Sequence, residues 1–269
     1  LDVPSKAWVG PLIARLQAEI TPPGKDKSAI DPFKDELFWQ TTAAQLLGVI
    51  GDPQAVEPLL KVMLDPNKGD VQATALLALV KLGKPTVDAA SKLIAGKDDK
   101  LVGFAMRRIK EISGKDPQGT PYVGTAALVL GTTGRSDATP ALIAALSSEK
   151  DAPTRAVIAR ELTKVPATEE SKAAFKTAYE SFTLETEIPP GAGALEVLTE
   201  AAGQFYDPGL IDWLLDRAAK TKGSGDDLKA YQAGVTQVAL KLAKTDQLAT
   251  VKAAVDRYGS DDIEKKLYK

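Results

Sequence analysis

Residues 44–64 read AQLLGVIGDPQAVEPLLKVML, and this stretch decides the fold class. An apolar helical segment runs up to Gly48 and Gly51, after which Asp52 and Pro53 provide a turn. Beyond the turn, apolar residues fall at positions i, i+3, i+4, i+7 and i+8, a spacing that gathers them on one face of a helix. These residues are Val56, Leu59, Leu60, Met63 and Leu64. The stretch therefore predicts two helices joined by a tight turn.

The same pattern recurs twice in the chain. Residues 127–146 (ALVLGTTGRSDATPALIAAL) repeat both glycines 83 residues further on. Residues 73–94 (ATALLALVKLGKPTVDAASKLI) place Gly83 32 residues after Gly51. A period in the thirties is typical of helix-turn-helix repeats, which stack because a single helix pair leaves one apolar face uncovered.

The order LGxxGD followed by an apolar second helix resembles the HEAT-like repeats named after phycobilin lyases. The resemblance is clearest over residues 44–155, and Arg155 stands near a helix start where such repeats often place an arginine. It implies an all-α fold, a right-handed α-α superhelix of about six helix pairs. Further helices are expected from period and turn chemistry alone, at residues 100–112, 171–182, 195–205, 210–219, 228–244 and 246–258.

The predicted organisation has three parts. Residues 1–42 form an irregular helical cap, residues 43–187 the HEAT-like repeats, and residues 188–269 divergent helical repeats that continue the same solenoid. The loop at residues 188–193, which contains Pro189 and Pro190, is the expected hinge. Sustained alternation of apolar and polar residues is absent from the sequence, so no sheet is expected.

The chain of 269 residues contains no His and no Cys. Catalytic systems built on Ser-His-Asp or Cys-His are thereby excluded, as are disulfides and the usual zinc sites. Carboxylate pairs, lysine bases and oxygen-ligand metal sites remain open. We expect no catalytic residues, no metal and no cofactor.

The formal net charge of −2 does not favour nucleic acid, because domains that bind phosphates usually carry an excess of Lys and Arg. The sequence also lacks an apolar run of the length that spans a bilayer. The chain begins at Leu1 without a signal sequence, which suggests a processed product and leaves room for a membrane tether upstream. This composition favours a bacterial periplasm or cell envelope over the cytoplasm.

Five residues are candidates for partner binding: Glu57, Lys61, Arg107, Arg108 and Trp213. Glu57 and Lys61 share a helix face by their i, i+4 spacing and lie off the apolar stripe. Arg107 and Arg108 form the densest basic cluster, for which a solvated helix surface is the competing interpretation. Trp213 is of a residue type enriched at interfaces, although its spacing from Leu210 and Leu214 also fits the core.

Two functions are compatible with these features. The first is a non-catalytic scaffold or assembly subunit that binds a protein partner or a larger assembly through the repeat surface. The alternative is a lyase-like or nucleic-acid-modifying enzyme that uses carboxylates.

Overall fold

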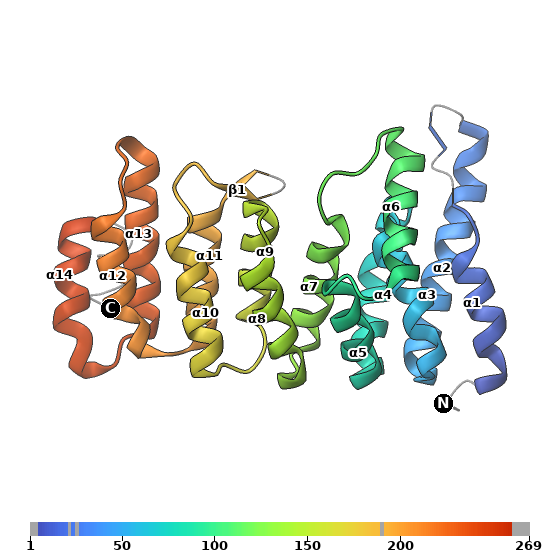
Figure 1. Cartoon of the computed structure of the whole chain (residues 1–269), viewed down its shortest axis with the longest axis horizontal. Helices are drawn as coiled ribbons and strands as arrows, with labels where there is room; N and C mark the ends of the chain where they lie inside the picture. The colour runs from blue at the N-terminus through green and yellow to red at the C-terminus, as the bar shows by residue number, and fades with distance from the viewer. Residues whose placement is uncertain (1–4, 21–22, 25–26, 189–190, 260–269) are drawn as a thin grey trace. The chain divides into compact units, whose positions relative to one another are not determined.

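The computed structural model describes residues 5–20, 23–24, 27–188 and 191–259, and it is built almost entirely from helices (Figure 1). The prediction of an all-α fold is confirmed. Among the described residues there are fourteen α-helices. They are α1 (Val9–Gln17), α2 (Ile30–Ile50), α3 (Val56–Leu64), α4 (Gly69–Leu82), α5 (Lys84–Ile94), α6 (Asp99–Ser113), α7 (Pro121–Thr133), α8 (Thr139–Ser148), α9 (Ala152–Leu162), α10 (Glu169–Glu180), α11 (Ala194–Ala202), α12 (Ile211–Lys220), α13 (Gly225–Leu242) and α14 (Leu248–Tyr258).

Twelve of these helices form six consecutive pairs, α2–α3, α4–α5, α7–α8, α9–α10, α11–α12 and α13–α14. Helices α1 and α6 stand outside this pairing. The helix expected at residues 100–112 is therefore present as α6, an extra helix between the second and third of these pairs. This insertion explains why the second and third copies of the motif are spaced more widely than the first two.

The chain divides into two compact units, Leu1–Ala145 and Leu146–Lys269. This division falls inside α8, whereas the sequence placed its boundaries after residues 42 and 187. Residue 42 lies in the middle of α2, so the segment before it is continuous with the first repeat and is no separate cap. The predicted hinge residues Pro189 and Pro190 lie outside the described part of the chain.

The turn between α2 and α3 follows directly from its sequence. Gly51 adopts a left-handed conformation with φ 73°, which glycine reaches without steric cost, and its amide donates to the carbonyl of Leu47. Asp52 then caps the 3-10 turn Pro53–Ala55 by accepting a hydrogen bond from the Gln54 amide. All five residues of the predicted apolar stripe of α3 are buried. The register of the first repeat is therefore confirmed.

Within the first unit, α4 packs against α2 on one side and contacts α7 on the other. The crossing of α2 and α4 is close because Gly48 carries no side chain there. A Cβ added at Gly48 would lie 2.8 Å from both the Cα and the Cβ of Ala78. Gly48 thus allows close helix packing, and the alanines at 43, 44 and 75 are also buried.

The second unit contains a short pairing of strands, β1 (Glu187–Ile188) with β2 (Ala192–Gly193), where the sequence predicted only a loop. Its core is centred on α10, where Phe175 and Tyr179 are fully buried. The Tyr179 hydroxyl lies 2.5 Å from the Thr199 hydroxyl and donates to that of Tyr231 at 3.1 Å. Burial raises the pKa of Tyr179 well above its ordinary value, so the Tyr179 hydroxyl stays protonated.

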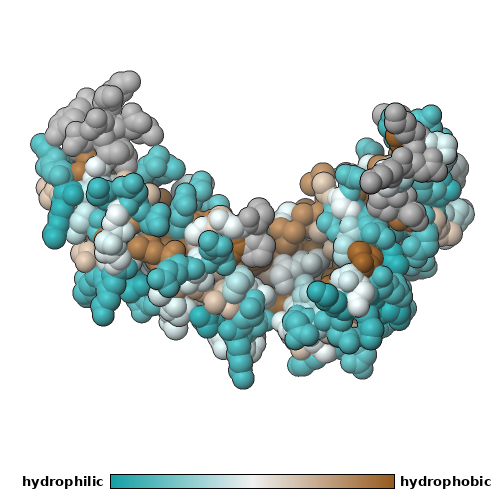
Figure 2. Space-filling view, turned by 90° about the horizontal axis from the view of Figure 1, so that it is seen from above, coloured by the Kyte–Doolittle hydropathy of each residue, from teal (hydrophilic) through white to brown (hydrophobic). Residues whose placement is uncertain are grey.

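Hydrophilic residues cover most of the face seen in Figure 2, with hydrophobic residues gathered between them, as expected for helices that bury only one side. Of the helices in the described ranges, none is both long and apolar enough to cross a membrane.

Candidate protein-binding surface

The exposed side of α3 carries a charged ridge, which we define as Glu57 and Lys61. Their side chains form an ion pair of 2.8 Å along the helix, as the i, i+4 spacing predicts. Lys100 of α6 donates to the same Glu57 carboxylate at 2.9 Å. Burial alone would raise the pKa of Glu57, but the hydrogen bonds from Lys100 and Lys61 lower it, so the carboxylate stays ionised.

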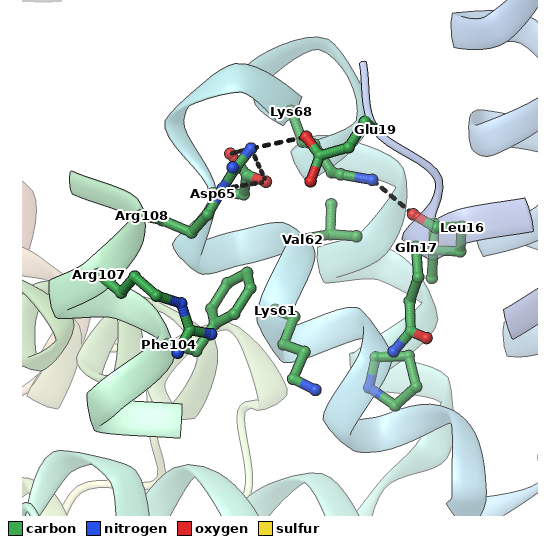
Figure 3. Close-up of a pocket in the computed structure, with 11 residues that line it drawn as sticks. Leu16, Gln17, Glu19, Lys61, Val62, Asp65, Lys68, Phe104, Arg107 and Arg108 are labelled. Carbon is green, nitrogen blue, oxygen red and sulfur yellow. Dashed lines mark hydrogen bonds and ion pairs between the residues drawn. The ribbon is translucent and has the colours of Figure 1, made fainter. Parts of the chain in front are cut away.

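Two hollows lie on the two sides of this ridge. The first, called here the α3–α6 pocket, has a volume of about 250 Å³ and is shown in Figure 3. Its lining comes from α1, α3, α6 and the segments that follow α1 and α3: Leu16, Gln17, Glu19, Pro58, Lys61, Val62, Asp65, Lys68, Phe104, Arg107 and Arg108. The second, called the α3–α5 hollow, is wider at about 610 Å³ and is lined by Glu57, Asp88, Lys92 and Asp98 among others. Three of the five candidate residues thus meet in one pocket.

Arg108 lies at the upper end of the α3–α6 pocket and is almost buried, with a side chain that is 12% exposed. Its guanidinium donates to Asp65 and to Glu19, both at 3.1 Å, and to Glu111 at 3.0 Å. Burial alone would lower the pKa of Arg108, but the hydrogen bonds to Asp65 and Glu111 raise it. The interpretation of Arg108 as a solvated surface residue is therefore wrong, because α6 turns it towards carboxylates that are far away in the sequence.

Lys68 is a second buried cation at this pocket, and sequence reasoning missed it. Its ammonium donates to the carbonyls of Leu16 and Ala18 at 2.6 and 2.8 Å and to the Gln40 side-chain oxygen at 2.8 Å. Burial lowers the pKa of Lys68. Together with Arg108, this lysine attaches the end of α1 and the segment after it to the first repeat.

Arg107 lines the same pocket as Arg108 but leaves α6 in a different direction, since neighbouring residues on a helix are about 100° apart. Its side chain is 63% exposed, as the solvated-surface interpretation expected, and its ion pair with Glu111 is long at 3.8 Å. The guanidinium lies 5.9 Å from the centre of the Phe104 ring, and the Lys61 ammonium lies 5.8 Å from the same ring. Sequence reasoning missed Phe104, although its i, i+3 spacing from Arg107 was a usable signal.

Comparison with protein families identifies the repeats of this fold. A family described as HEAT repeats matches residues 39–106, from the middle of α2 to the middle of α6. The chain is a HEAT-repeat protein. No curated protein matches the chain. The match covers α3 and its ridge, together with six of the eleven residues that line the α3–α6 pocket.

Trp213 lies in the second unit, does not line the α3–α6 pocket, and is half-buried at the edge of the core around α10. Its ring meets those of Tyr179 and Phe175 edge-on, with ring centres 5.1 and 6.4 Å apart. The indole N–H donates to the Glu180 carboxylate at 2.9 Å, and the Lys176 ammonium lies 5.4 Å from the ring centre. One edge of the Trp213 ring packs in the core and the other faces charged side chains, and a role in partner binding stays a prediction.

Two tryptophans of the first unit, Trp8 and Trp39, are exposed. Trp8 is 58% exposed and Trp39 is 52% exposed. Trp39 contacts the equally exposed Phe38 edge-on, with ring centres 5.2 Å apart. Both residues of this pair lie on the outer side of α2, away from the residues that line the α3–α6 pocket.

Proposed function

We propose that this chain is a non-catalytic protein-binding scaffold that engages its partner through α3 and the hollows on both sides of it. HEAT repeats commonly act as protein-interaction modules, because stacked helices present a row of side chains on one continuous surface. The observation that carries the proposal is the ridge of Glu57 and Lys61, which stands between two hollows and is bordered by the aromatic ring of Phe104. Aromatic residues and arginines, here Phe104 and Arg107, are enriched at protein interfaces.

The state of the buried carboxylates supports a scaffold over an enzyme. General acid-base catalysis needs a carboxylate that can exchange protons with a substrate. Asp65 and Glu161 are both buried, and each forms ion pairs with basic side chains. Asp65 binds Arg108, while Glu161 lies 2.9 Å from Arg160 and 2.7 Å from Lys164. Asp65 thus joins α6 to the segment after α3, whereas Glu161 pairs with cations in and directly after its own helix, and both roles fit a scaffold.

Site-specific photo-crosslinking in the cells that produce the protein tests this proposal. A photoreactive amino acid replaces Lys61 in the full chain, and a matched variant carries it at Lys220. Lys220 is the suitable control because it also forms an i, i+4 ion pair, with Asp216 at 2.8 Å, but lies on the second unit. A discrete protein adduct from position 61 that is absent from position 220 is the expected result. Identical adducts at both positions, or none at position 61, would overturn the proposal.

A second arm tests the ridge itself. The crosslinker is moved to Gln54, an exposed residue that lines the α3–α5 hollow. The charges of the ridge are then exchanged by Glu57→Lys together with Lys61→Glu, which keeps an ion pair along α3 and inverts its direction. We expect the adduct from position 54 to disappear, while circular dichroism stays unchanged. An adduct that survives the exchange would show that the ridge is not part of the interface.

A further inference from the structure

We infer that the α3–α6 pocket binds an acidic side chain of the partner protein, which Lys61 and Arg107 hold beside the ring of Phe104. This inference rests on the proposed function and specifies its chemistry. Figure 3 shows the Phe104 ring between the Arg107 guanidinium and the Lys61 ammonium. Both cations lie within 6 Å of that ring centre, at 5.9 and 5.8 Å. A carboxylate in the pocket would meet two preplaced cations.

The cations at the pocket mouth are not fully neutralised by the chain itself. The carboxylate of Glu57 is shared between Lys61 and Lys100, at 2.8 and 2.7 Å. The carboxylate of Glu111 bonds Arg108 at 3.0 Å, which leaves it 3.8 Å from Arg107. Each acidic group near the mouth thus serves more than one cation, and Arg107 keeps only a long ion pair. An incoming carboxylate would complete the charge balance.

The walls of the pocket suit the rest of an acidic residue. Phe104 positions both cations through cation-π contacts, which lowers the entropy lost on binding. Pro58 and Val62 are buried apolar residues that line the same pocket and provide contact for a methylene stem. The volume of about 250 Å³ is below the ~300–1,000 Å³ of typical cofactor sites, so one side chain of a macromolecule fits better than a free small molecule.

The surroundings favour a protein carboxylate over a nucleic-acid phosphate. The Glu19 side chain, 76% exposed, lies at one end of the pocket, and Glu57 stands on its border. Asp88 and Asp98 line the neighbouring α3–α5 hollow. A chain of phosphates that passed over this surface would meet these carboxylates, whereas a single acidic side chain reaches the cations without crossing them. The acidic residue of the partner is therefore expected among neutral or basic neighbours.

Nuclear magnetic resonance of the full chain tests this inference with two blocked peptides, acetyl-Ala-Ala-Glu-Ala-Ala-amide and the same peptide with Gln in place of Glu. The Nε–H signal of Arg107 reports binding, and the signal of Arg108 is the internal reference because its hydrogen bonds are already occupied. We expect the Glu peptide to shift the Arg107 signal and to bind at least about tenfold more tightly than the Gln peptide, the usual advantage of hydrogen bonds to charged groups.

Variants and a competing ligand complete the test. Lys61→Gln and Arg107→Gln should each lower the affinity for the Glu peptide about tenfold or more. Binding to the Lys61→Gln variant is followed by the Arg107 signal, and binding to the Arg107→Gln variant by backbone signals of the pocket residues. Lys220→Gln should leave its affinity unchanged. Equal affinity for the two peptides, or tighter binding of a thymidine hexanucleotide than of the Glu peptide, would overturn the inference. If position 61 gives a crosslinked adduct but the two peptides bind equally, the acidic ligand is refuted and the proposed function stands. If position 61 gives no adduct, the proposed function itself is refuted.

Discussion

The close crossing of α2 and α4 predicts that replacing glycine by alanine lowers the stability of the protein at Gly48 but raises it at Gly103. Gly48→Ala adds a Cβ that would lie 2.8 Å from the Cα and Cβ of Ala78, a distance that real Cβ atoms do not adopt. One of these two atoms belongs to the backbone, so a rotamer change cannot relieve the clash and the helices must separate. Gly103→Ala in α6 adds a Cβ with no neighbour within 4 Å. Both substitutions favour helix formation equally.

The magnitudes follow from two opposing contributions. Replacement of a helical Gly by Ala stabilises by about 1 kcal/mol, and this is the whole effect expected at Gly103. Overpacking of a well-packed contact costs about 1–3 kcal/mol, and the backbone clash at Gly48 places it in the upper part of that range. We therefore expect Gly48→Ala to destabilise the first unit by about 1–2 kcal/mol after the helix contribution is subtracted.

Urea denaturation followed by tryptophan fluorescence measures both effects. Trp8 and Trp39 lie in the first unit and Trp213 in the second, so a Trp213→Phe background restricts the signal to the first unit. A Gly48→Ala variant as stable as its parent would refute the close approach of α2 to α4. A Gly103→Ala variant that loses as much stability as Gly48→Ala would show that the crossing is not what distinguishes the two glycines.

Three further predictions concern buried and paired side chains. Leu59→Ala should lower the free energy of unfolding by about 2–5 kcal/mol, because Leu59 is 0% exposed in the core of the first repeat; a loss far below 1 kcal/mol in urea denaturation would contradict its register. Arg108→Met should cost about 3–5 kcal/mol because it leaves the Asp65 carboxylate buried without its cation, and adding Asp65→Asn should recover much of that loss in a double-mutant cycle. Asp207→Asn should cost less than about 1 kcal/mol at neutral pH. The hydrogen bond from Lys172 lowers the pKa of Asp207 below its ordinary 3.8. The difference in unfolding free energy between the parent and Asp207→Asn should therefore be present above pH 3.8 and vanish as the pH falls through the folded-state pKa of Asp207. A difference in unfolding free energy that persists in acid would refute this ion pair.

Much of the repeat could be predicted from the sequence because its determinants are local. The offsets of the apolar residues fix which face of α3 is buried, and the Gly51 turn depends only on neighbouring backbone. Simple apolarity was less informative. Ala73 and Leu77 lie in the most apolar stretch of the chain, yet both are exposed, because a helix at this position buries only part of its circumference.

The α3–α6 pocket could be predicted only in part, because it depends on contacts between distant segments. Glu57 and Lys61 are four residues apart, and their pairing was correctly expected. Arg108 reaches Asp65 across 43 residues and Glu19 across 89, so its burial is decided by where α6 packs. The inserted position of α6 has no counterpart in the repeat period. Lys68 was missed for the same reason, whereas Phe104 was missed although its i, i+3 spacing from Arg107 is a local signal.

The tie between α6 and the segment after α1 has a consequence for how the first unit unfolds. A linear array of repeats ordinarily frays from its ends, since each unit contacts only its neighbours. Here Arg108 and Lys68 join the amino-terminal helix to residues from two later elements. The terminal helix can open only if these bonds break as well. Amide hydrogens of α1 should therefore exchange with solvent almost as slowly as those of α3, because α1 unfolds together with the later helices of the first unit.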